Sequence, residues 1–164
     1  MKSHRIIFIL IPILGSQLSL QAAELPKDLR VAEEMIRDGL ARDAVTRLRG
    51  WLQKNASSPQ PEAQVLLAEA LLADGRPTEA LAALPKSSPG DLTHRVLLVR
   101  ALALNEAGRW KEALAEWKRI DFTSLPEAQA NQARLGLATA QLNENQRPEG
   151  LKELRQLTEK ADVA

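Results

Sequence analysis

The chain has 164 residues, of which 45% are hydrophobic and 3% aromatic, and it contains no cysteine. A chain of this length can build a domain with its own hydrophobic core. The 22 basic and 21 acidic side chains nearly balance, so no excess of positive charge attracts nucleic acid. Without thiols, disulfides and cysteine-based zinc or catalytic sites are excluded.

Residues 1–23 have the layout of a secretory signal peptide. The basic stretch MKSHR precedes the apolar run IIFILIPIL, and the small residues Ala22 and Ala23 follow. We expect cleavage near Ala22 or Ala23, which would place the mature protein in the periplasm or outside the cell. An uncleaved membrane anchor is the alternative, but the run turns polar at Gly15, short of the ~20 apolar residues of a spanning helix. We therefore expect no membrane insertion after cleavage.

The next segment, residues 24–160, repeats one pattern four times and is followed by a short tail, residues 161–164. Three columns of residues recur at intervals of 36, 33 and 37 positions. The columns are Ala32, Ala68, Ala101 and Ala138; then Gly39, Gly75, Gly108 and Asn145; and then Ala44, Ala80, Ala113 and Gly150. Self-similarity at this period is typical of helical-repeat proteins.

Each copy is predicted to be two helices separated by the Gly or Asn of the middle column. Gly and Asn tolerate a positive φ and so end a helix at low cost. Pro77 and Pro148 suit the first turn of the helices that follow. The predicted hairpins cover residues 27–54, 61–85, 91–120 and 126–160, which makes the fold all-α. Because Gln141 and Gly150 replace the usual Leu or Met and Ala, we expect the fourth hairpin to be the loosest.

The pattern resembles the tetratricopeptide repeat, a helical hairpin of about 34 residues with small residues at two fixed places. The resemblance is clearest in VLLAEALLADGRPTEALAAL and VLLVRALALNEAGRWKEALAEW, and it extends over essentially the whole mature chain. The Trp and Tyr that are usual in the family are missing from the corresponding positions. The resemblance implies a short right-handed α-solenoid of stacked hairpins.

The position of each helix in the stack affects its expected burial. The first helices of the second and third copies are apolar on nearly every face, which predicts burial by neighbours. Trp117 falls on a core stripe, whereas Trp110 is expected near the surface at a helix start. The last helix carries Leu151, Leu154 and Leu157 on one stripe. This stripe either packs on its own hairpin or docks another chain, which makes self-association through the C-terminal hairpin a second partner hypothesis.

Few side chains are suited to catalysis. His94 is the only histidine of the mature chain, which argues against a Ser–His–acid triad or a histidine-rich metal site. It follows Asp91 near a helix start, where a local capping contact is the simpler role. The adjacent Glu33 and Glu34 would point about 100° apart on a helix. No glycine-rich phosphate loop occurs, and we expect no enzyme activity, no cofactor and no metal.

The tetratricopeptide resemblance also implies a concave groove along the first helices, which in that family binds an extended or helical peptide. The corresponding residues here are Leu29, Glu33, Ile36, Arg37, Val65, Glu69, Leu72, Leu98, Leu102, Asn105, Leu135, Thr139 and Asn143. Most are aliphatic, which suits the apolar face of a partner segment. For Val65 and Leu98 the alternative is that they form core between repeats.

These features favour a non-catalytic protein–protein interaction scaffold or adaptor of the bacterial periplasm or cell envelope. The expected partner is another protein, held as a peptide or helix in the groove. An accessory or regulatory subunit of an envelope or secreted enzyme complex is the alternative.

Overall fold

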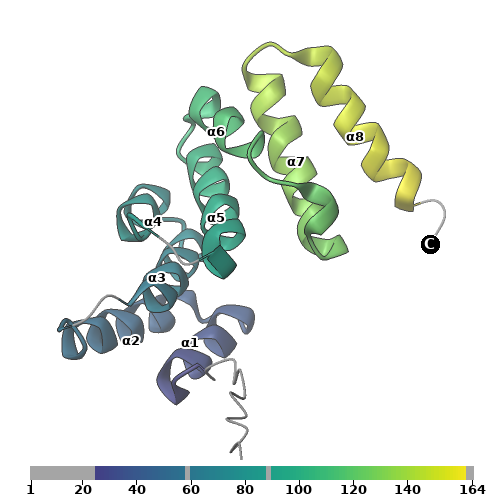
Figure 1. Ribbon diagram of the computed structural model, residues 1–164. Coiled ribbons are helices and arrows are strands. Elements are labelled where there is room, and N and C mark those ends of the chain that lie inside the picture. The colour runs from purple at the N-terminus through teal and green to yellow at the C-terminus, as the bar shows by residue number, and fades with distance from the viewer. Residues whose placement is uncertain (1–24, 58–59, 88–89, 162–164) are drawn as a thin grey trace, which may run out of the picture.

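The computed structural model describes residues 25–57, 60–87 and 90–161, so the predicted signal peptide lies outside the described residues. All regular structure in these ranges is helical, which confirms the all-α class (Figure 1). In chain order the elements are α1 (Lys27–Arg37), α2 (Ala41–Lys54), α3 (Pro61–Ala73), α4 (Pro77–Ala83), η1 (Gly90–Leu92), α5 (Thr93–Glu106), α6 (Trp110–Trp117), η2 (Phe122–Ser124), α7 (Glu127–Asn143) and α8 (Arg147–Ala161). Helix α8 ends at Ala161, the first residue of the predicted tail.

A residue with a positive φ ends the first helix of every pair, as the middle column predicts. The φ angles are 78° at Gly39, 73° at Gly75, 70° at Gly108 and 61° at Asn145. At each of these turns the next N–H donates to the carbonyl oxygen five residues earlier, as from Arg76 to Leu71 at 2.9 Å. This is the Schellman arrangement, which satisfies carbonyls at a helix end. The repeat therefore fixes where each hairpin turns.

The small residues of the other two columns are buried within the helix pairs. All seven alanines are 0% exposed, and Gly150 is also buried. Short side chains at these places allow the two backbones of a pair to approach closely. A Cβ at Gly150 would lie 2.8 Å from Leu142 Cγ, so the fourth hairpin is closely packed at this contact. The expectation that it is the loosest of the four stays a prediction. The glycine permits a close approach of α7 and α8.

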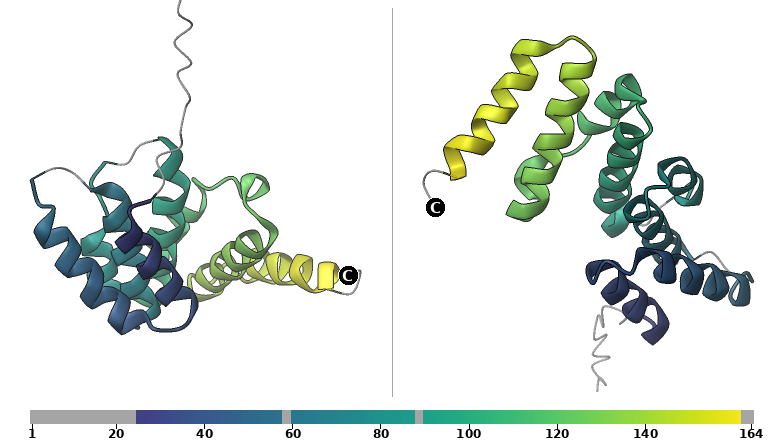
Figure 2. Two further views of the ribbon diagram at one scale, coloured as in Figure 1. Left: turned by 90° about the horizontal axis from the view of Figure 1, so that it is seen from below. Right: turned by 180° about the vertical axis from the view of Figure 1, so that it is seen from behind.

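The helices pack as sequential neighbours in a curved row from α1 to α8 (Figures 1 and 2). Each first helix also contacts the first helix of the next pair, so that α1, α3, α5 and α7 form a series. One core cluster joins α1–α4 to α5, and a second joins α5, α6 and α7 around Trp117. As predicted, α3 and α5 are buried on several faces. None of the described residues of α8 belongs to either cluster.

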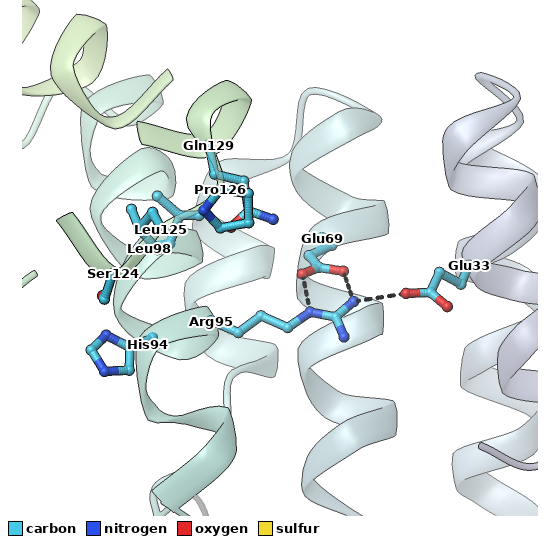
Figure 3. Close-up of a pocket in the computed structure, with 9 residues that line it drawn as sticks. All are labelled: Glu33, Glu69, His94, Arg95, Leu98, Ser124, Leu125, Pro126 and Gln129. Carbon is cyan, nitrogen blue, oxygen red and sulfur yellow. Dashed lines mark hydrogen bonds and ion pairs between the residues drawn. The ribbon is translucent and has the colours of Figure 1, made fainter. Parts of the chain in front are cut away.

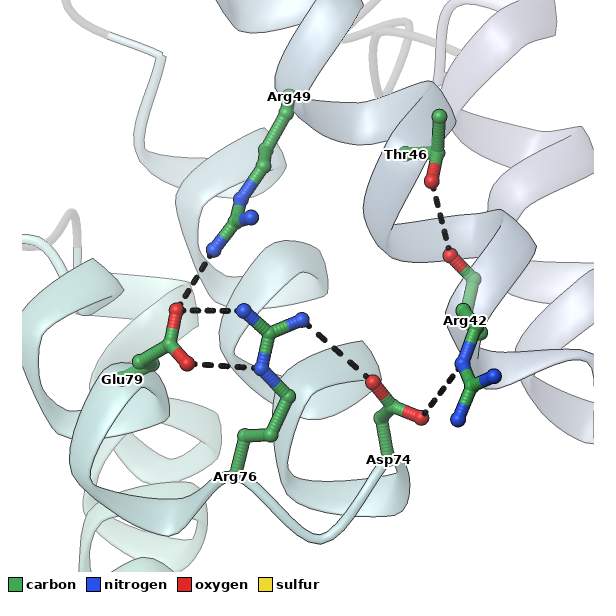
Figure 4. A network of polar contacts seen from close by, with 6 residues as sticks. All are labelled: Arg42, Thr46, Arg49, Asp74, Arg76 and Glu79. Carbon is green, nitrogen blue, oxygen red and sulfur yellow. Dashed lines mark hydrogen bonds and ion pairs between the residues drawn. The ribbon is translucent and has the colours of Figure 1, made fainter.

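Ion pairs connect α2 to the following pair of helices (Figure 4). The Arg49 guanidinium lies 2.8 Å from Glu79, which also accepts two hydrogen bonds of 2.7 Å from Arg76. Asp74 lies 3.5 Å from Arg76 and 3.7 Å from Arg42. The hydrogen bonds from Arg76 and Arg49 hold the pKa of Glu79 below its ordinary value of 4.5. These contacts orient one helix pair relative to the next, although exposed ion pairs contribute little to the free energy of unfolding.

Candidate functional site

Three adjoining hollows run across the first helices and form one groove. We call them the arginine hollow, around Arg95, the central hollow, and the tryptophan hollow, around Trp110; their volumes are about 500, 610 and 340 Å³. The arginine and central hollows share Glu69, Leu98 and Gln129, and the central and tryptophan hollows share Leu102, Glu106 and Gln132. The shared walls make the groove continuous from α1 to α7.

Most of the side chains that the sequence predicts for the groove line these hollows. They are Glu33, Ile36, Arg37, Glu69, Leu72, Leu98, Leu102, Asn105, Leu135 and Thr139. Leu98 is buried but contributes to the floor of two hollows, so it serves both the core and the groove.

Three predicted positions do not line the hollows, and two of them are corrections. Leu29 is 2% exposed and Val65 0%, and both belong to the core cluster of α1–α4. Both side chains pack between helices and are not accessible to a partner. For Val65 this is the alternative already stated, that it forms core between repeats. Asn143 is exposed at the end of α7, where its amide donates to the Thr139 carbonyl oxygen at 2.8 Å. Fewer residues therefore line the groove than the sequence predicts.

The sequence predicts that Asn105 binds the partner, whereas the structure gives it a role in holding helices together. It is buried, and its Nδ2 donates to the Gly136 carbonyl oxygen at 2.7 Å. Its Oδ1 lies 3.5 Å from Nε1 of Trp117, the largest fully buried side chain among the described residues. One amide thus connects α5, α6 and α7, because a buried polar side chain needs such partners. These contacts hold α5 beside α7, where Asn105 and Gly136 both line the groove.

The arginine hollow is organised by an ion-pair group from three successive first helices (Figure 3). The Nε and Nη2 atoms of Arg95 on α5 donate to the two carboxylate oxygens of Glu69 on α3, both at 2.6 Å. Nη2 also lies 3.5 Å from a carboxylate oxygen of Glu33 on α1. The hydrogen bond to Glu69 raises the pKa of Arg95 against the effect of its burial. One cation therefore serves two carboxylates, and its bidentate geometry fixes α3 against α5.

The sequence prediction included both carboxylates of this group but missed Arg95. The available signal was spacing, since Arg95 precedes Leu98 by three residues and so shares its face of α5.

The central hollow has an aliphatic floor and charged edges. Leu72 and Leu102 are half-buried there, each packed on the margin of one core cluster. Arg37 at the end of α1 and Glu106 at the end of α5 also line it. Both are exposed, and neither forms an ion pair with another residue that the structure describes. The floor suits apolar side chains, and the edges offer one charge of each sign in addition to Glu69, which is paired with Arg95.

The tryptophan hollow combines an aromatic side chain with aliphatic walls. Trp110 begins α6 and is half-buried, close to the surface as predicted. Leu135 on α7 is 52% exposed, the most exposed large hydrophobic side chain among the described residues. The polar side chains that line this hollow are Asn105, Glu106, Gln132 and Thr139. This hollow therefore includes an exposed apolar side chain that a partner can cover.

The C-terminal hairpin offers a smaller apolar surface. Leu151 is exposed, whereas Leu154 and Leu157 are half-buried against the hairpin. The guanidinium of Arg134 on α7 lies 3.0 Å from Glu153 and 2.7 Å from Gln156 on α8. The contact between these helices is thus partly polar, and much of the leucine stripe packs on its own pair.

The groove shows no arrangement that assigns a reaction. His94 is exposed at the edge of the arginine hollow, and within the described ranges no group of three or more His, Asp or Glu side chains is placed to hold a metal. No helix between residues 25 and 161, where described, is long and apolar enough to cross a membrane. Comparison with family models, curated proteins and solved structures finds no match to the chain.

Proposed function

We propose that the protein is a non-catalytic interaction scaffold or adaptor that binds a segment of another protein in the groove. The observation that carries this proposal is the half-exposed aliphatic surface of Leu72, Leu102 and Leu135, which line two adjoining hollows of the groove. Apolar area left in water costs roughly 25 cal/mol per Å² relative to a buried state. A partner that covers these side chains recovers that free energy.

The proposal includes a tetratricopeptide-like right-handed solenoid. Three features support it: the repeated columns, the positive φ at each hairpin turn, and the contacts between successive first helices. In such an array the first helices present a row of equivalent side chains, which suits an extended or helical segment that crosses them. The single residues that face the groove then determine which segment fits.

The proposed compartment is the bacterial periplasm or cell envelope. It is supported by the signal-peptide pattern of residues 1–23. The partner is therefore an envelope or secreted protein, and N-terminal sequencing of the exported chain should begin at Ala23 or Glu24. An intact Met1 on the exported chain would remove this part of the proposal.

The groove is tested with Leu72→Glu combined with Leu102→Glu, using tagged mature protein and envelope extract. A carboxylate brought against a partner's apolar surface must be desolvated without a counter-ion, so captured partner should be lost. Helicity by circular dichroism should be retained, because both side chains are only half-buried.

The matched control is Leu40→Glu, since Leu40 is 50% exposed and does not line the three hollows. Retained helix with undiminished capture by the double variant would show that the partner binds elsewhere. Loss of helix would show that the groove floor is structural core.

A further inference from the structure

We propose that the tryptophan hollow binds a basic side chain, lysine or arginine, at the end of the partner's apolar segment that lies towards α7. This inference rests on the proposed function of the groove and specifies the chemistry of its partner. It depends on the charge of Glu106, the ring of Trp110 and the aliphatic walls beside them.

The first step is the uncompensated charge of this hollow. Glu106 is the only charged side chain among the described residues that line this hollow, and it is exposed. No described residue forms an ion pair with it. The carboxylates of the arginine hollow differ, because Arg95 already contacts both Glu69 and Glu33. At Glu106 a partner's cation would meet a carboxylate that has no ion-pair partner among the described residues, whereas beside Glu69 and Glu33 it would also approach the like charge of Arg95.

The second step is the match between the walls and a long basic side chain. Lys and Arg carry an apolar stem below a charged end, and they bury the stem while the end stays solvated or paired. Leu102 and Leu135 supply aliphatic surface for such a stem. The face of a tryptophan ring attracts cations, and Trp110 lines the same small hollow as Glu106. An acidic or neutral side chain would use only the aliphatic part of this site.

The third step concerns the direction in which the partner segment lies along the groove. The central hollow separates the tryptophan hollow from α1 and is bordered at α1 by Arg37, which makes no ion pair with a described residue. A basic residue at that end of the partner would be repelled by Arg37. The segment is therefore oriented with its apolar side chains over Leu72 and Leu102 and its basic end over Glu106.

The experiment uses two synthetic helical peptides with the same leucine stripe, one ending in arginine and the other in glutamate. Binding to the mature protein is measured by calorimetry and by the emission of Trp110, with Trp51 and Trp117 as the other tryptophans. We expect the arginine peptide to bind about five- to tenfold more tightly, as a half-exposed ion pair and cation–π contact would give. Glu106→Gln should lower the affinity of the arginine peptide and so reduce the preference, leaving only the part that the Trp110 ring supplies.

Glu34→Gln is the control, because Glu34 is an exposed carboxylate on α1 that lines none of the three hollows. It should leave both affinities unchanged. Equal binding of the two peptides, or an unchanged preference in Glu106→Gln, would overturn the basic-residue site while leaving the groove intact. Absence of binding by both peptides would overturn the groove as a peptide site as well.

Discussion

Replacing Gly136 by alanine should destabilise the protein although the glycine lies inside a helix. A Cβ at position 136 would overlap Cζ2 of Trp117 and would lie 3.0 Å from Cη2 of the same ring. That ring is 1% exposed and packed between helices, so it has no free space into which to move. Helix α7 must shift instead, and the shift strains the 2.7 Å hydrogen bond from Asn105 to the Gly136 carbonyl oxygen.

Three contributions determine how much Gly136→Ala changes the free energy of unfolding. Extra volume in a packed core typically costs about 1–3 kcal/mol. Loss of the Asn105 hydrogen bond costs about 1 kcal/mol more. Alanine in place of glycine within a helix returns about 1 kcal/mol. The net expectation is a destabilisation of about 1–3 kcal/mol, which for a domain of this size lowers Tm by roughly 3–10 °C.

Thermal and urea unfolding of Gly136→Ala and Gly50→Ala provide the assay. Gly50 lies within α2, and a Cβ there meets nothing within 4 Å. Gly50→Ala should therefore stabilise the protein by about 0.5–1 kcal/mol through helix propensity alone. Opposite signs for the two substitutions are expected. If Gly136→Ala were as stabilising as Gly50→Ala, the packing of α7 against Trp117 would be refuted.

Three further predictions concern packing, pH and local stability. Ala101→Leu should lower the free energy of thermal unfolding by about 1–3 kcal/mol, because it adds volume inside a helix pair. The control Glu112→Gln, at an exposed side chain, should change it by no more than about 0.5 kcal/mol. Equal changes for the two variants would contradict the close packing at Ala101. Because the folded pKa of Glu79 is lowered, its contribution to stability is present above its ordinary pKa of 4.5 and is lost as the pH falls through the folded value. Urea unfolding from neutral to acidic pH should therefore show a smaller loss of stability for Glu79→Gln than for wild type, and identical profiles would contradict it. Amide exchange followed by mass spectrometry should be faster in α8 than in α5, since no described α8 residue joins either core cluster; equal protection would refute this.

Local rules explain why the hairpin turns were predictable from the sequence. Gly75 and Asn145 end helices because of their own backbone preferences, so their role can be inferred without knowing what surrounds them. The alanine columns were predictable for a similar reason, since a small residue repeated with the helices indicates a close approach. Ala68 and Ala101 are accordingly fully buried.

The groove was only partly predictable because its details depend on how the helices sit relative to one another. Arg95 joins carboxylates 26 and 62 residues earlier in the chain, a relation that no local pattern encodes. Asn105 falls on the predicted binding face, yet the proximity of Gly136 and Trp117 turns it into a buried connector. Val65 shares the apolar character of the groove floor, and only the packing of the neighbouring helices around α3 makes it part of the core.

Site-specific photo-crosslinking in intact cells tests most directly whether the groove is the partner-binding surface. A photoreactive amino acid is placed at Leu102 in the groove or at Thr46, an exposed position on α2 outside the three hollows. We predict a discrete covalent adduct with another protein from position 102 and none from position 46. Adducts of equal yield from both positions, or none from position 102 under conditions where the tagged protein captures its partner, would contradict a binding groove on the first helices.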